Sequence, residues 1–209
     1  MVRAILEGRK TVTRRVIKPV PQMVTDRAAV TWEGDPAVLL RLLEQNGRKC
    51  PYGQPGDRLW VRESFTDLRG TGIEHRPDPA GPLQRYAFAA DSPPGSYSDD
   101  ARKDFGIKWK PSIHMPRAAC RMLLEITAVR VERLQDINEE QAVAEGVDRP
   151  ENIRNVDVWD GAERELFNAM NQPRDRFKRL WADINGAESW DANPWVWVVE
   201  FKRVEAASV

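Results

Sequence analysis

The strand-like segments of this sequence do not alternate regularly with helical ones. Alternating or β-branched residues predict strands over residues 11–17, 58–63, 122–134 and 194–204. Helical spacing and stop signals predict short helices at 2–6, 38–43 and 139–145, and apolar helical faces at 166–170 and 177–184. Such an order favours an α+β fold: a small mixed or antiparallel β-barrel with flanking helices.

One stretch of the chain has a different composition. Seven of the fifteen prolines fall between Pro77 and Pro116, interleaved with glycines and aspartates. Proline lacks an amide hydrogen and fixes its backbone angle, so it interrupts helices and sheets. We therefore predict a long surface insertion over about 64–118 with little regular structure.

Length and composition exclude several classes of protein. The 209 residues suit one domain with insertions. No apolar run approaches the ~18 residues of a membrane span, and the charged N-terminus lacks signal-peptide features, so we expect a cytoplasmic protein without membrane association. Cys50 and Cys120 lack zinc-module or disulfide-framework spacing, and His75 and His114 lack metal-ligand spacing, so we expect no metal.

Charge is balanced overall but segregated along the chain. Lysine plus arginine and aspartate plus glutamate each total 32, yet residues 1–20 carry six basic side chains against Glu7. Residues 132–165 carry eleven acidic side chains against four arginines. Two interpretations stay open: two solvated faces, or a basic ligand site with acidic partners.

The basic N-terminal segment contains a recognisable motif, Gly8-Arg9-Lys10-Thr11-Val12-Thr13-Arg14-Arg15. It resembles the G-x-K-x-x-x-x-R signature of the ASCH domain family, whose fold is a small β-barrel like that of PUA RNA-binding domains. Thr13 stands where the family usually has glutamate. In this respect the motif resembles one branch of the family, the small bacterial amidohydrolases that remove the acyl group from N(4)-acetylcytidine. In that branch lysine, threonine and arginine have this spacing.

The resemblance covers about half of the chain. Residues 55–61, 126–134 and 195–202 resemble strands of the family, and 134–146 resembles the helix that carries the branch's catalytic glutamate, which falls on Glu145. Residues 64–118 and 148–180 have no counterpart in the smallest members. The chain thus resembles a single ASCH domain over 1–209 with these two insertions, like the longer members carried by phages and prophages.

The motif residues have a chemical rationale. Amide hydrolysis without a metal needs a nucleophile, a base and a group that stabilises the oxyanion, and Thr13, Lys10 and Arg15 offer these. Glu145 ends its helix, where a negative charge is disfavoured, so we predict that it contacts the Lys10 cation. In a strict strand, Lys10 and Thr13 would face opposite sides, so the two converge only if the chain still turns near residues 9–11.

Other residues are candidates for binding the substrate. These are Arg9, Arg15, Trp109 and His114, the last two lying in a segment with an aromatic ring and cations. Most other tryptophans, including Trp195 and Trp197, are expected in the core. The leading hypothesis is a cofactor-free amidohydrolase acting on a modified nucleoside. The alternative is a PUA-like RNA-binding module. A third, weaker hypothesis is that the chain is a ribonuclease.

Overall fold

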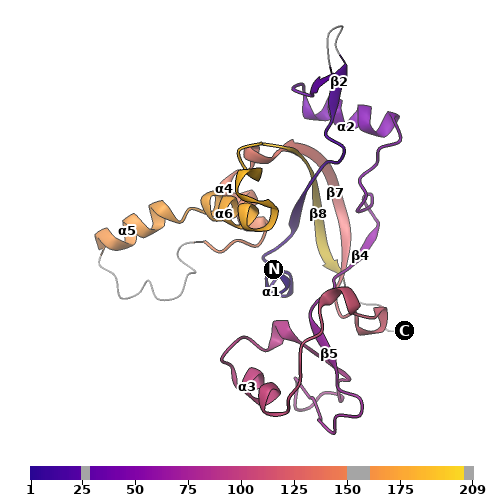
Figure 1. Cartoon of the computed structure of the whole chain (residues 1–209), viewed down its shortest axis with the longest axis vertical. Helices are drawn as coiled ribbons and strands as arrows, with labels where there is room; N and C mark the ends of the chain where they lie inside the picture. Colours follow the sequence, from indigo (N-terminus) through magenta and orange to yellow (C-terminus); the bar gives the residue numbers. More distant parts are fainter. Residues whose placement is uncertain (25–28, 150–160, 205–209) are drawn as a thin grey trace. The chain divides into compact units, whose positions relative to one another are not determined.

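The computed structural model describes residues 1–24, 29–149 and 161–204. These form an α+β fold with a curled antiparallel sheet and several helices (Figure 1). The chain divides into two compact units. Unit 1 contains Arg3–Leu59 and Glu125–Arg203, and unit 2 contains Trp60–Leu124. The predicted insertion at 64–118 therefore lies within unit 2.

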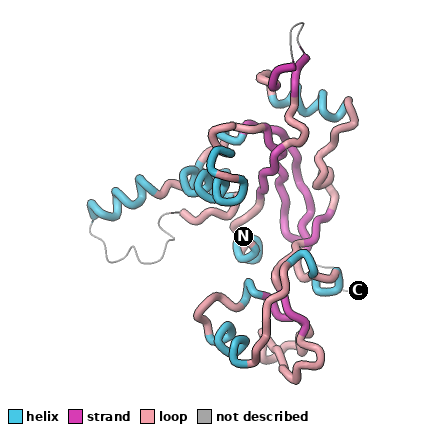
Figure 2. The backbone as a smooth tube through the Cα atoms, viewed as in Figure 1, coloured by secondary structure: helices cyan, strands magenta, loops and turns pink. Residues whose placement is uncertain are grey.

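The main sheet has four strands in the order β1, β8, β7, β4. Figure 2 draws the strands in magenta. Their bounds are Val12–Val16 for β1, Arg58–Trp60 for β4, Leu123–Arg133 for β7 and Trp195–Val204 for β8. Strands β1 and β8 are antiparallel, and their register pairs Thr13 with Val199 and Arg14 with Val198. Paired residues of neighbouring strands point to the same face of a sheet. The register with β8 therefore shows, for each β1 residue, which of the two faces its side chain is on.

Helices cover one face of the sheet in unit 1. Helix α4 spans Glu139–Ala144 and α6 spans Pro173–Asn185, while α1 (Val2–Leu6) precedes β1 and α5 (Gly161–Met170) precedes α6. Side chains of β1, β8, α4, α6 and the segments that flank these helices form one cluster. It is here called the helix-side core and comprises Val12, Leu134, Ile137, Ala142, Val147, Phe177, Trp181, Trp190, Val196 and Val198. This core holds α4 and α6 against the end of β1.

The opposite face packs on a second cluster, the α2-side core. It comprises Ile17, Leu39, Leu43, Cys50, Ile126, Val131, Trp195, Trp197 and Val199. Helix α2 (Pro36–Gln45) supplies two of these residues, and strands β2 (Gln22–Val24) and β3 (Ala29–Thr31) form a hairpin before it. The expectation that Trp195 and Trp197 are core residues is confirmed, since both are buried.

Unit 2 has its own small core. Strands β5 (Phe65–Asp67) and β6 (Tyr86–Phe88) pair antiparallel, and helix α3 spans Tyr97–Asp104. Phe65, Phe88, Met115 and Ala119 form the buried cluster. The Arg121 guanidinium donates two hydrogen bonds of 2.8 Å to the buried Glu63 carboxylate, and it also contacts Asp91. The predicted insertion thus contains more regular structure than its prolines suggested.

Most predicted elements are confirmed, with differences at their edges. The strand predicted over 58–63 ends at Trp60. Leu180 and Ile184 on α6 are exposed rather than buried, because only Phe177 and Trp181 of the predicted apolar face reach the core. The predicted insertion at 148–180 includes 150–160, which lie outside the described residues. Within 1–24, 29–149 and 161–204, no helix is long and apolar enough to cross a membrane.

Candidate functional site

The site begins where helix α4 ends. A capping box starts this helix: Asn138 accepts a hydrogen bond from the Gln141 amide, and the Gln141 side chain accepts one from the Asn138 amide. The helix closes on Glu145, whose amide donates to the Gln141 carbonyl, and Gly146 follows with φ of +90°. A positive φ favours glycine, so the local sequence fixes where α4 stops and where the Glu145 side chain emerges.

Lys10 meets Glu145 through both backbone and side chain. The two residues form an isolated β-bridge, flanked by a hydrogen bond from the Thr11 amide to the Ala144 carbonyl. Lys10 Nζ lies 2.7 Å from each of three acceptors: Glu145 Oε2, the Glu145 carbonyl and the Val12 carbonyl. The predicted Lys10–Glu145 contact is confirmed, and the ammonium also offsets the negative end of the α4 dipole.

Further charges extend this pair into a network. Arg14, whose side chain is fully buried, donates to Glu145 Oε1 at 3.3 Å and to Glu132 Oε2 at 3.0 Å. Arg130 on β7 then contacts both Glu132 and Glu200 of β8. Three cations and three carboxylates therefore link β1, β7 and β8 to the end of α4, and their formal charges cancel. We call these six residues, Lys10, Arg14, Arg130, Glu132, Glu145 and Glu200, the charge network.

Burial dominates the electrostatics of Lys10. Removal from water lowers the pKa of the Lys10 ammonium below its ordinary value, because the charged form loses hydration. The Glu145 carboxylate raises this pKa, while Arg15 and Arg14 lower it. The net direction is downward, which is the direction that a lysine needs to exchange protons nearer to neutral pH.

Thr13 and Arg15 lie on the other face of β1. Thr13 pairs with Val199 of the α2-side core, whereas Val12 belongs to the helix-side core beside Glu145. The Thr13 hydroxyl is buried and has no hydrogen-bond partner within the described part of the chain. Arg15 is exposed and donates to the Arg14 carbonyl at 3.0 Å. The structure therefore joins Lys10 to Glu145 but does not bring Thr13 to this pair.

The remaining predicted binding residues have separate surroundings. Arg9 pairs with Glu7 and, at 2.8 Å, with Asp148. Trp109 and His114 belong to unit 2. Trp109 is half-buried, with the Arg102 guanidinium 5.4 Å from its ring centre, and His114 is exposed.

A pocket of about 380 Å³ borders the charge network. Its walls include Thr11 and Val12 of the β1 segment, Gln141 and Ala144 of α4, and the network's own Arg130 and Glu200. Other lining residues are Thr127, Glu140, Phe201 and Lys202. The pocket offers hydrogen-bond donors and acceptors over a mixed polar and apolar wall, as expected of a site for a small polar molecule.

Sequence reasoning missed four members of the network. Arg14 carried a usable signal, because strand alternation placed this cation on the same face as Val12 and Val16. A charged residue on an apolar face requires a buried partner. Glu132, Arg130 and Glu200 gave no such signal, since long-range strand pairing brings them together.

Within 1–24, 29–149 and 161–204, no group of three or more histidine, cysteine or carboxylate side chains is arranged to hold a metal ion. Comparison with protein-family models, with curated proteins and with solved structures finds no match for this chain. The function is therefore inferred from the geometry of the charge network and its pocket.

Proposed function

We propose that this chain is a metal-independent amidohydrolase that removes the acyl group from N(4)-acetylcytidine or a related modified nucleoside. The observation that carries the proposal is the buried contact of 2.7 Å between Lys10 Nζ and Glu145 Oε2. These are the lysine and glutamate that the resemblance to PUA-like ASCH amidohydrolases would use. They are 135 positions apart, and their chain neighbours Thr11 and Ala144 line the pocket that borders the charge network.

The proposed reaction is a simple hydrolysis. Water adds to the acyl carbon, the bond between that carbon and N4 breaks, and N4 takes a proton, leaving cytidine and the carboxylate of the acyl group. Lys10 and Glu145 would relay protons, because burial lowers the pKa of Lys10 and the Glu145 carboxylate lies 2.7 Å from Lys10 Nζ. Arg130, which lines the pocket, would counter the negative charge that develops on the acyl oxygen.

The test follows acetylcytidine cleavage by its absorbance change. Replacing Lys10 by Met keeps the length of the side chain but removes its charge and protons, and Glu145→Gln removes the carboxylate. We expect each to lower kcat at least ~100-fold, the usual size of an acid–base contribution. Lys18→Ala, which removes an exposed lysine beyond β1, is the control. Full turnover in folded Lys10→Met protein would refute the proposal.

A separate pair of variants tests whether Thr13 is the nucleophile. Thr13→Val removes the hydroxyl at nearly constant volume, and Thr13→Ser keeps it. Loss of turnover in Thr13→Val with retention in Thr13→Ser assigns Thr13 as the nucleophile and requires β1 to turn on substrate binding, because Thr13 now faces the α2-side core. Equal turnover in both variants assigns water as the nucleophile.

A second candidate function, RNA binding, is favoured by a different observation in unit 2. The guanidinium groups of Arg62 and Arg117 lie 4.7 Å and 5.2 Å from the Trp60 ring centre, and both arginines are exposed. Aromatic rings with arginines are the usual components of single-strand binding. The affinity for RNA should fall steeply as salt is added, because the phosphates bind the arginines. Trp60→Ala should also lower this affinity, and Tyr97→Ala, at an exposed position, is the control. Hydrolysis of a neutral nucleoside should hardly respond to salt.

A further inference from the structure

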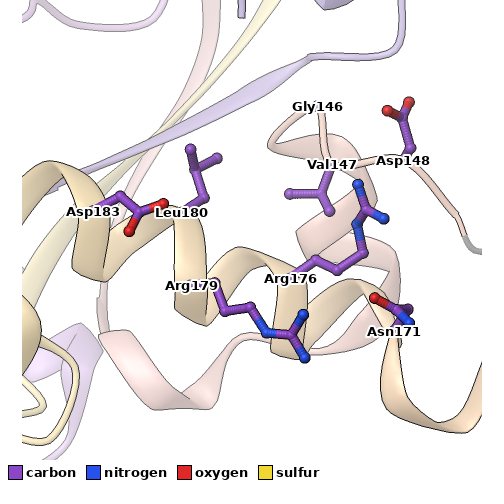
Figure 3. A pocket seen from close by; sticks show the side chains of 8 residues that line it. All are labelled: Gly146, Val147, Asp148, Asn171, Arg176, Arg179, Leu180 and Asp183. Atoms are coloured by element: carbon purple, nitrogen blue, oxygen red, sulfur yellow. The ribbon is translucent and has the colours of Figure 1, made fainter. Parts of the chain in front are cut away.

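A second pocket, of about 390 Å³, starts at the residue that follows Glu145. The segment 146–148 forms one wall and helix α6 forms the other (Figure 3). Arg176 and Arg179 of α6 both line it. Because residues three apart share one face of a helix, these two guanidinium groups serve the same pocket.

Arg176 has unused hydrogen-bond donors. Its Nε is buried without a hydrogen-bond partner, and its guanidinium forms no ion pair with any described residue. The contrast is with Arg174 on the same helix, which donates to the carbonyls of Ile137 and Gln135. Arg179 uses one donor on the Met170 carbonyl. A buried donor without an acceptor is costly, so a ligand that supplies acceptors would be bound favourably.

The acidic residues of this pocket do not cancel its positive charge. Asp148 is already paired with Arg9, whose guanidinium lies 2.8 Å from its carboxylate. Asp183 is exposed, and Figure 3 places it beside Leu180, away from Arg176. The pocket thus presents two guanidinium groups to a ligand and favours an anion with several acceptor oxygens, which arginine binds by paired hydrogen bonds.

We infer that this pocket binds the phosphate group of a nucleotide. The inference rests on the proposed function, and it specifies the substrate: a phosphorylated acylcytidine rather than the free nucleoside. Glu145 and Gly146 are consecutive, so a phosphate held by Arg176 would lie on the segment that continues from the charge network. The phosphate would belong either to a 5′-mononucleotide or to an RNA chain, which share the same chemistry.

Direct titration with cytidine 5′-monophosphate tests binding without catalysis. Arg176→Ala should weaken this binding about tenfold to hundredfold, the cost of a charge-assisted hydrogen-bonded contact. Lys178→Ala removes one cation from an exposed position of the same helix and is the matched control. Inorganic phosphate should compete with the nucleotide for wild-type protein. Thermal denaturation of Arg176→Ala shows whether the variant is folded, and phosphate competition tests the site without any substitution.

Kinetics then separate this inference from the proposed function. We expect a higher kcat/KM for acetylcytidine 5′-monophosphate than for acetylcytidine, and Arg176→Ala should remove that preference. Equal kcat/KM values, with no phosphate competition, would overturn the phosphate site while hydrolysis stands. Nucleotide binding that depends on Arg176, without any hydrolysis, would support the site and refute the proposed activity. An RNA oligonucleotide containing acetylcytidine, without terminal phosphates, distinguishes the sources: preference for it over the mononucleotide assigns the site to chain phosphates.

Discussion

At the scale of single residues, the charge network determines how the site is held together. Lys10 and Arg14 share the Glu145 carboxylate, and all three side chains are at most 5% exposed. Charges removed from water are tolerated only when they are paired, and loss of one partner leaves the other unsatisfied. The site residues are therefore expected to affect stability as well as chemistry.

Glu145→Gln tests this coupling. The substitution leaves the buried Lys10 ammonium and Arg14 guanidinium without their shared carboxylate, so we expect a loss of about 3–5 kcal/mol in the free energy of unfolding. Urea denaturation measures it. Glu140→Gln, an exposed position on the same helix, should change stability by less than about 0.5 kcal/mol. Similar losses in both variants would contradict a special role for the buried carboxylate.

The lowered pKa of Lys10 predicts a pH effect on stability. Between this lowered pKa and the ordinary value of 10.5, the folded chain binds fewer protons at Lys10 than the unfolded chain does. Stability contributed by this group therefore rises with pH across that window. The free energy of unfolding of the wild type, minus that of Lys10→Met, should increase as the pH rises through the lowered pKa of Lys10 towards 10.5. A difference that falls over this range would mean that Glu145 outweighs burial.

At the scale of elements, the end of α4 positions the site. Gly146 has φ of +90°, and a Cβ atom there would lie 2.9 Å from Ala4 Cβ and 3.1 Å from Lys10 Cβ. This closeness seats the α4 terminus directly against the lysine-bearing segment. Any side chain at position 146 would therefore disturb the Lys10–Glu145 contact.

Gly146→Ala is expected to destabilise the protein by about 1–3 kcal/mol from the strained backbone alone, with a further loss from the clash. Gly186→Ala is a matched control, because Gly186 has φ of +102° but open space where a Cβ atom would lie. Thermal denaturation of both variants separates strain from clash. Equal losses would show that the close approach of Lys10 and Ala4 adds nothing.

These elements differ in how far sequence predicts them. The capping box at Asn138 and the stop at Gly146 are local signals, so the prediction of α4 was confirmed, and with it the position of Glu145. The face of Thr13 depends on the pairing of β1 with β8, which no local pattern specifies. Arg176 was not identified either, because its role depends on the segment 146–148 across the pocket.

At the scale of the whole molecule, the two units have separate cores. Tryptophans and valines fill unit 1, where alternation in long strands made burial predictable. Unit 2 was predicted as irregular because of its prolines. Its β5–β6 hairpin nevertheless contributes Phe65 and Phe88 to a buried cluster with Met115 and Ala119. Its strands have three residues each, too short for a periodic pattern to identify. Separate cores imply that each unit opens independently.

Hydrogen exchange tests this independence through the buried acids of the two units. Glu63→Gln weakens the partnership with Arg121 inside unit 2, where the Glu63 side chain is 1% exposed. In this variant the backbone amides of unit 2, between residues 60 and 124, should exchange faster, while those of β1 and β8 keep their protection. Glu145→Gln should produce the reverse pattern, so each variant is the control for the other. If either substitution accelerates exchange equally in both units, the chain opens as one cooperative body, because loss of a buried partner in one core then destabilises the other to the same extent.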